Sequence, residues 1–299
     1  MNRVIPAFND LLQLAQVAAS RRWRTQARRT SVGSGAYRSM FRGRGMEFDE
    51  SRPYAPGDDA RNLDWRVTAR TSRPHTKLFR EERERPVLLA VDYRASMRFA
   101  TRGLFKSVMA AHLAALLAWS AEQRGDRVGG CIFTESAVTE SRPKRGRSVV
   151  LRWLQTLVQL AGTDGLADAA LNSGMAIHNA LARLAFHARP GSLVYVLSDF
   201  RQMDASALTN LTRMARHSEV VLVFIHDPLE QHLPPGQSRF AYGAQRLTLL
   251  ADQNIRERHA EAFLQRKAAL QQFALSHRIR FIECSTQDDP VNAFRACRG

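Results

Sequence analysis

Two aspartates at the ends of apolar runs are the residues of this sequence best suited to chemistry. The run 87–91 closes on Asp92, and a second run closes on Asp199 in the same way. After Asp92, polar residues recur at every second position, a spacing that turns the side chains of an extended chain to one side. Carboxylate and hydroxyl oxygens are the ligands that hard cations such as Mg²⁺ prefer. The predicted ligand site consists of Asp92, Arg94, Ser96, Ser173 and Asp199.

A parallel sheet is the element that would bring these side chains together. The apolar runs that fit strands lie at 87–92, 127–133, 193–199, 219–225 and 279–284. The helical patterns lie at 104–123, 148–161, 173–187, 203–217 and 254–277. Alternation of strands and helices predicts a doubly wound, mostly parallel α/β sheet, and such sheets bind ligands at the carboxyl ends of their strands. We therefore expect Asp92 and Asp199 at the same end of neighbouring strands.

Arg94 argues against a bound metal at this position. It places a permanent positive charge two residues from Asp92, and its planar guanidinium pairs well with a carboxylate. Two carboxylates about 4 Å apart repel each other by about 4 kcal/mol at an effective dielectric constant near 20, so a positive group must offset them. We predict that Arg94 takes this role and that the site holds no Mg²⁺. In the alternative interpretation, Asp92 and Asp199 are ordinary strand-end acids that are ion-paired to Arg94.

Motifs of classical catalysis are missing from the sequence. The serines lie in no GxSxG elbow, and the nine histidines form no HExxH pattern. Three widely spaced cysteines, at 131, 284 and 297, have no zinc-ligand spacing and predict free thiols in a reducing compartment. A metal-dependent hydrolase is therefore the least favoured function.

The net charge of +16 favours acidic partners, and it is concentrated near the N-terminus. Residues 1–46 hold nine arginines and one acid, Asp10, so we predict a basic helix and arm over residues 1–44. This arm either contacts phosphates or lipid headgroups or folds over the domain as a charged face. The apolar stretch 108–119 is too short to span a bilayer, and no signal peptide is recognised. The expected location is the cytoplasm, with attachment to the inner membrane surface through charge.

Residues 45–85 combine turn-forming residues with alternating charges. We predict that this segment is a small subdomain packed on a sheet domain of residues 86–299. Tyr54 and Trp65 are expected to be its buried anchors, and its acids and arginines are expected to form an ion-pair network. Adjacent carboxylates such as Asp58 and Asp59 near several arginines are more often structural than catalytic.

This segment resembles the bacterial family called domain of unknown function 58, and the resemblance extends over residues 43–225. The residues that carry it are Glu47, Arg52, Tyr54, Gly57, Asp58, Asp59, Arg61, Asp64, Trp65 and Arg70. The pattern Asp92-Tyr-Arg94-Ala-Ser96 is also similar to the Asp-x-Ser-x-Ser signature of the metal-ion-dependent adhesion site in von Willebrand factor A domains. Ser173 and Asp199 take the places of the later Thr and Asp of that signature. The resemblance implies a von Willebrand A-like fold with a degenerate adhesion site.

The resemblance also implies a protein-interaction role, because members of the family are typically encoded beside AAA+ ATPases of the MoxR type. Our first hypothesis is a non-enzymatic adaptor that binds such an ATPase and an acidic client protein or an anionic membrane surface. The alternative hypothesis is a binder of anionic polymers that acts through the arginine-rich arm. In that case a membrane surface is favoured over nucleic acid as the partner.

Overall fold

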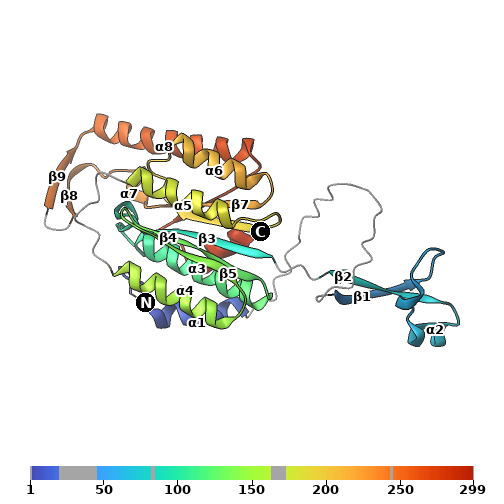
Figure 1. Ribbon diagram of the computed structural model, residues 1–299. Helices are drawn as coiled ribbons and strands as arrows, with labels where there is room; N and C mark the ends of the chain where they lie inside the picture. The colour runs from blue at the N-terminus through green and yellow to red at the C-terminus, as the bar shows by residue number, and fades with distance from the viewer. Residues whose placement is uncertain (1, 20–45, 82–84, 163–172, 243–244, 299) are drawn as a thin grey trace. The chain divides into compact units, whose positions relative to one another are not determined.

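The computed structural model describes residues 2–19, 46–81, 85–162, 173–242 and 245–298 (Figure 1). The chain divides into two units, of which the first comprises residues 1–25 and 85–299 and the second comprises residues 26–84. Most of the predicted arginine-rich arm, residues 20–44, lies outside the described residues.

The first unit contains a six-stranded sheet in the order β10-β7-β6-β3-β4-β5. Its parallel strands are β3 (Pro86–Asp92), β4 (Arg127–Phe133), β6 (Leu193–Ser198), β7 (Glu219–His226) and β10 (Arg280–Ser285). Only the edge strand β5 (Val138–Lys144) is antiparallel among the described strands of this sheet, and it is longer than the piece expected at 137–139. The predicted doubly wound, mostly parallel α/β sheet is confirmed.

Helices cover both faces of this sheet (Figure 1). One layer consists of α1 (Phe8–Ala19), α3 (Lys106–Gln123), α4 (Arg147–Ala161) and α9 (Pro290–Arg298). The other consists of α5 (Ser173–His187), α6 (Ala205–Ala215) and α8 (Gln253–Ser276). Alternate residues of β3 serve the two layers: Leu89 packs with the α3 cluster, and Leu88 packs with the α5 cluster. Strand β3 is therefore buried on both faces, as its unbroken apolar run predicts.

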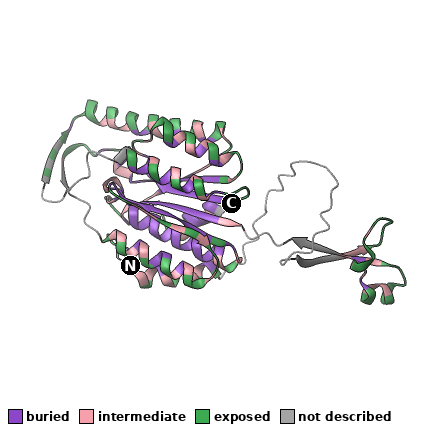
Figure 2. Cartoon of the chain, viewed as in Figure 1, coloured by how far each residue is buried: buried purple, intermediate pink, exposed green. Residues whose placement is uncertain are grey.

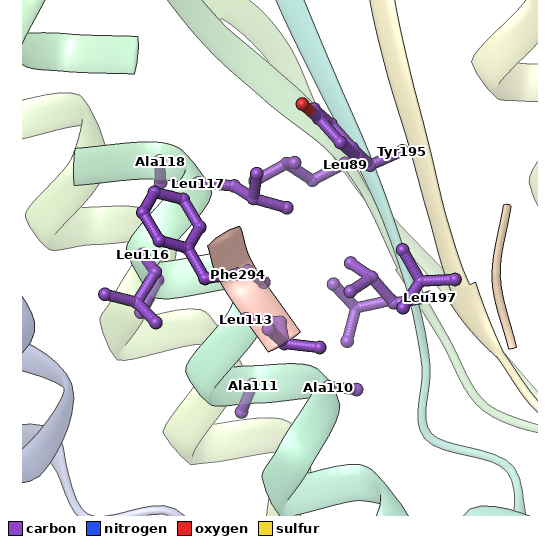
Figure 3. Packing of buried hydrophobic residues seen from close by; sticks show 14 of the residues in the cluster. Leu89, Ala110, Ala111, Leu113, Leu116, Leu117, Ala118, Tyr195, Leu197 and Phe294 are labelled. Carbon is purple, nitrogen blue, oxygen red and sulfur yellow. The ribbon is translucent and has the colours of Figure 1, made fainter. Parts of the chain in front are cut away.

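Helix α3 is the centre of its layer, and every residue from Lys106 to Ala121 is buried (Figure 2). Figure 3 shows Leu89, Tyr195 and Leu197 of the sheet on one side of α3 and Phe294 of α9 nearby. A helix that is apolar on all sides must be covered on all sides. The first unit meets this need with α1, α4 and α9.

The N-terminal helix belongs to this core, which corrects the expected division at residue 44. Leu11, Leu14 and Ala18 of α1 are buried against α3, and the Trp119 indole donates a hydrogen bond to the Leu11 carbonyl at 3.1 Å. The physical reason is that the outer side of α3 is apolar and needs a cover. The first unit also includes α7 (Pro228–Gln231) and a hairpin of β8 (Gly236–Tyr242) and β9 (Gln245–Ala251).

In the second unit, β1 (Met46–Pro53) pairs antiparallel with β2 (His75–Glu81). The connection contains the 3₁₀ turn η1 (Ala60–Asn62) and helix α2 (Trp65–Thr71). The expectation of buried aromatic anchors is wrong, because Trp65 is 70% exposed and Tyr54 is 37% exposed. Among the described side chains of this unit only Asp64 and Thr76 are buried, and these two polar residues give an aromatic ring no apolar cover.

Candidate functional site

The carboxyl edge of the sheet brings the two predicted aspartates together. Asp92 is the last residue of β3, and Asp199 follows directly after β6. The two strands are parallel neighbours with Val91 opposite Leu197, so both aspartates emerge at the same edge. Both side chains are buried. The predicted convergence is confirmed.

Arg94 lies between these two carboxylates, as the sequence predicts. Its Nη2 donates to Asp92 Oδ2 at 2.7 Å, and its Nε donates to Asp92 Oδ1 at 3.0 Å. The same Nη2 lies 3.7 Å from Asp199 Oδ1, and the whole side chain is only 1% exposed. The Ser198 hydroxyl donates a further hydrogen bond to Asp92 Oδ2, at 2.6 Å. Burial alone would lower the pKa of Arg94, but the adjacent Asp92 reverses the shift and keeps the guanidinium charged.

A second buried cation, Lys106, was not predicted. Its Nζ lies 2.9 Å from Asp199 Oδ2 and 2.6 Å from Glu230 Oε1. Arg201 donates from Nη2 to the same Glu230 oxygen at 3.0 Å. The cluster thus holds three carboxylates and three cations, which balance in charge. We call it the edge network, made of Asp92, Arg94, Lys106, Asp199, Arg201 and Glu230.

One signal in the sequence could have revealed Lys106. It is one of only four lysines in the chain, and it opens an otherwise apolar helix. A cation at a helix N-terminus is unfavourable for the helix dipole, which indicates that its charge is used elsewhere. Its partner Glu230 gave no comparable signal, because it lies in the four-residue helix α7 at a separation of 124 residues.

The electrostatics of Asp199 reflect competition between burial and these cations. Burial alone would raise the pKa of its carboxyl group, since it disfavours the charged form. Lys106 and Arg94 overcome this effect and hold the pKa at about 2. Asp199 therefore stays ionised at neutral pH and is not available as a general acid.

The turn after β6 has a strained backbone that the edge network holds in place. Phe200 and Gln202 have φ angles of 50° and 57°, which are uncommon for residues other than glycine. Between them, the Arg201 N–H donates to Asp199 Oδ1 at 3.1 Å, and the Arg201 carbonyl accepts from Arg94 Nη1 at 3.0 Å. Such conformations persist where surrounding contacts fix them, and they often mark binding sites.

Asp227, at the end of β7, extends the polar edge. Its carboxylate accepts hydrogen bonds from the Thr101 hydroxyl at 2.7 Å and from the Thr286 hydroxyl at 2.7 Å. It also forms a reciprocal capping box with Glu230 at the start of α7. Burial raises the pKa of Asp227, but these hydroxyl bonds overcome it and leave the pKa below its usual value.

The two predicted serines do not join this cluster. Ser96 lies half-buried in the 3₁₀ turn η2 (Ala95–Met97), and its hydroxyl makes no contact with the network among the described residues. Ser173 is the first residue of α5, and its side chain lies outside what the structure describes. Of the Asp-x-Arg-x-Ser pattern, Asp92 and Arg94 therefore belong to the edge network and Ser96 does not.

The donor set of the edge network does not fit a divalent cation. Asp199 Oδ2 already accepts a hydrogen bond from Lys106. Both oxygens of Asp92 already accept hydrogen bonds from Arg94, and Oδ2 also accepts one from Ser198. Within the described residues, no group of three His, Cys, Asp or Glu side chains is arranged to hold a metal ion. A metal would have to displace buried ammonium or guanidinium groups that cannot leave the protein.

The predicted signature residues of the second unit have structural roles. Arg52 pairs with Asp58 at 2.7 Å, as the expected ion-pair network requires. That network is otherwise corrected: Asp59 accepts from the Arg61 backbone, and Asp64 caps α2, so both bind N–H groups at helix starts instead of arginine side chains. Gly57 has a φ angle of 102°, which its turn requires and which a residue with Cβ rarely adopts. Arg61 and Arg70 are exposed, and nothing is described of the Glu47 side chain.

A protein-family model described as "Protein of unknown function DUF58" matches residues 50–269. The chain belongs to the DUF58 family. The match includes the Arg52–Asp58 turn and the whole edge network, whereas α1 and the arginine-rich arm precede it. The predicted family is thus confirmed, and its description names no activity.

Curated relatives of this DUF58 chain are uncharacterized as well. Uncharacterized protein Rv1480 of Mycobacterium tuberculosis and uncharacterized protein Mb1516 of Mycobacterium bovis are each 32% identical to it over 200 residues. The alignment covers 67% of this chain and 61% of each relative. The chain thus matches less than two thirds of the length of these relatives.

Two solved structures are similar to this DUF58 chain at low sequence identity. A conserved hypothetical protein BatB from Bacteroides thetaiotaomicron shares 13% identity at a TM-score of 0.44, covering 72% of this chain and 95% of its own. An aerotolerance-related membrane protein from Bacteroides fragilis shares 14% identity at a TM-score of 0.43, with coverages of 71% and 96%. In the part of this chain that the structure describes, no helix is both long and apolar enough to cross a membrane.

Proposed function

We propose that this DUF58 protein is a non-enzymatic adaptor whose partner is an AAA+ ATPase of the MoxR type. The observation that supports it is the charge balance of the edge network. Open α/β sheets place their reactive groups at the carboxyl edge. Here Asp92, Asp199 and Glu230 are buried and matched by cations, so none of the three is left to act as an acid, a base or a metal ligand.

The edge network is, in this proposal, a degenerate adhesion site. Arg94 and Lys106 supply from within the chain the positive charge that a divalent ion supplies in the metal-dependent form of the site. Association with the partner is then independent of Mg²⁺. A fold by itself does not define a function, so the proposal depends on this charge balance and on the family resemblance together.

Association of the purified full chain with a purified MoxR-type ATPase from the same genome tests the proposal. We expect the two proteins to co-elute in gel filtration without nucleotide, equally in the presence of EDTA or of free Mg²⁺. Calorimetric titration of the chain alone with Mg²⁺ should give no binding heat. Separate elution of the two proteins, or tight Mg²⁺ binding that Asp92→Ala abolishes, would contradict the proposal.

A further inference from the structure

The second unit has an exposed surface whose composition differs from that of an ordinary polar surface. Trp65 is 70% exposed at the start of α2, in a short helix with no apolar partner for its indole among the described residues. Arg66 and Arg70 follow on the same helix and are exposed, and Arg61 lies just before it. Tryptophan and arginine are the residues most enriched at the energetic centres of protein interfaces. We call this surface the Trp65 face, made of Arg61, Trp65, Arg66, Arg70 and Arg73.

The aspartates near this face are already bonded to other groups of the second unit. Asp58 pairs with Arg52 at 2.7 Å, and Asp59 accepts from the Arg61 backbone at 2.9 Å. Asp64 accepts from the Ser51 hydroxyl at 2.8 Å and from two backbone N–H groups of α2, and the Ser51 bond is the main cause of its lowered pKa. All three aspartates between residues 51 and 77 are therefore engaged, against six Lys and Arg in the same range.

The arginines of the Trp65 face form no ion pair within the described part of the chain, and all four are exposed. Arg66 and Arg70 stand at positions i and i+4 of α2, where like charges repel each other. The positive charges of these arginines therefore do not stabilise α2. An acidic partner would relieve this repulsion and cover the indole.

We propose that the Trp65 face is a docking surface for the acidic face of a partner protein, with Trp65 inserting among apolar side chains and the arginines pairing with surrounding carboxylates. This inference rests on the proposed adaptor function and places a partner contact on the second unit. Charge complementarity selects an acidic protein over a neutral one, and the exposed indole selects a protein over a simple polyanion.

Fluorine NMR of the full chain labelled with 5-fluorotryptophan tests the docking surface, because the four tryptophans report on different regions. Trp65 lies on the proposed face, Trp119 and Trp153 are buried in the core, and Trp23 falls in the arginine-rich segment. Substitution of each tryptophan by Phe assigns the signals. In the free protein we expect the Trp65 signal, but not those of Trp119 and Trp153, to shift when H₂O is replaced by D₂O.

The probe is an acidic peptide of repeated Glu-Glu-Leu units. We expect the Trp65 signal to move on titration, with apparent affinity falling steeply between about 0.05 M and about 0.5 M salt. The variant Arg66→Glu/Arg70→Glu should weaken this response by at least about tenfold. The control variant Arg213→Glu/Arg258→Glu, which makes the same charge change on exposed helix positions of the first unit, should leave it within about twofold.

Three results would overturn the docking surface. A Trp65 signal insensitive to D₂O would mean that the indole is covered in the free protein. A titration in which only Trp23 responds would assign the acidic contact to the arm. Equal responses of the two charge variants would mean that net charge alone drives binding. Because the probe is a peptide, each of these results is independent of whether the ATPase binds.

Discussion

Removing Lys106 tests the interpretation of the edge network most directly. The variant Lys106→Met keeps an unbranched side chain only one atom shorter but leaves Asp199 and Glu230 without their shared cation. At separations of 2.9 and 2.6 Å, each attraction is worth about 6 kcal/mol before desolvation is subtracted, at an effective dielectric constant of 20. Loss of one partner from a buried ion pair typically destabilises a protein by about 3–5 kcal/mol. We expect a loss in this range at pH 7, measured by urea denaturation.

The pH dependence of this loss separates an electrostatic cause from a packing defect. In the wild type the pKa of Asp199 is held at about 2, below the value near 3.9 in unfolded chains, so the ionised carboxylate contributes stability above pH 4. That contribution disappears as the pH falls from about 4 towards 2. In the variant, burial is no longer overcome, so the pKa of Asp199 rises and protonation relieves the unpaired charge. The difference between the two proteins should therefore be largest at pH 7 and shrink as the pH approaches 4.

Lys267→Met provides the matched control. Lys267 pairs with Glu283 at 2.5 Å, but the two side chains are 21% and 35% exposed, so water screens the pair. We expect a loss of about 1 kcal/mol or less at pH 7. A Lys106→Met variant that loses less than about 1 kcal/mol at pH 7, or loses the same amount at pH 7 and pH 4, would refute the reasoning.

Three further predictions address the site and the core. Because Lys106 remains beside Asp199, Arg94→Ser alone should not bind Mg²⁺, whereas Arg94→Ser/Lys106→Ser should gain measurable affinity in a calorimetric titration. Asp227→Asn should lose about 1.5–3 kcal/mol in urea denaturation at pH 7, because one amide oxygen cannot accept all the bonds of the carboxylate; this loss should diminish in acid, where the wild-type group protonates. Leu11→Ala should cost about 2–5 kcal/mol because Leu11 is fully buried, while Gln13→Ala on the exposed side of α1 should cost little.

The sheet and its two aspartates were predictable because their signals are local. An apolar run such as 87–91 fixes a strand buried on both faces, and the residue after it must lie at the strand end. Two strands with this layout on one parallel sheet place their terminal acids at one edge. The position of Arg94 followed in turn, because it is two residues from Asp92 and long enough to reach Asp199.

The rest of the edge network depends on contacts across the chain that no local pattern records. Lys106 meets Asp199 across 93 residues and Glu230 across 124 residues, through a helix, a strand end and a four-residue helix. Exposure was equally difficult to predict in the second unit, where Trp65 looked like an anchor by its type. Whether an aromatic ring is buried depends on the surface available to cover it, and a two-stranded hairpin supplies little.

The cost of the edge network argues that it fixes a precise surface. A group of six charges, of which all but Arg201 are buried, is rarely more stable than an apolar cluster of the same volume, so stability alone does not account for it. The same side chains, however, hold the Phe200–Gln202 turn in its strained conformation: Arg94 binds the Arg201 carbonyl, and Asp199 binds the Arg201 N–H. Apolar residues could not make these bonds. The charges at the sheet edge therefore hold the backbone of this turn in one defined conformation.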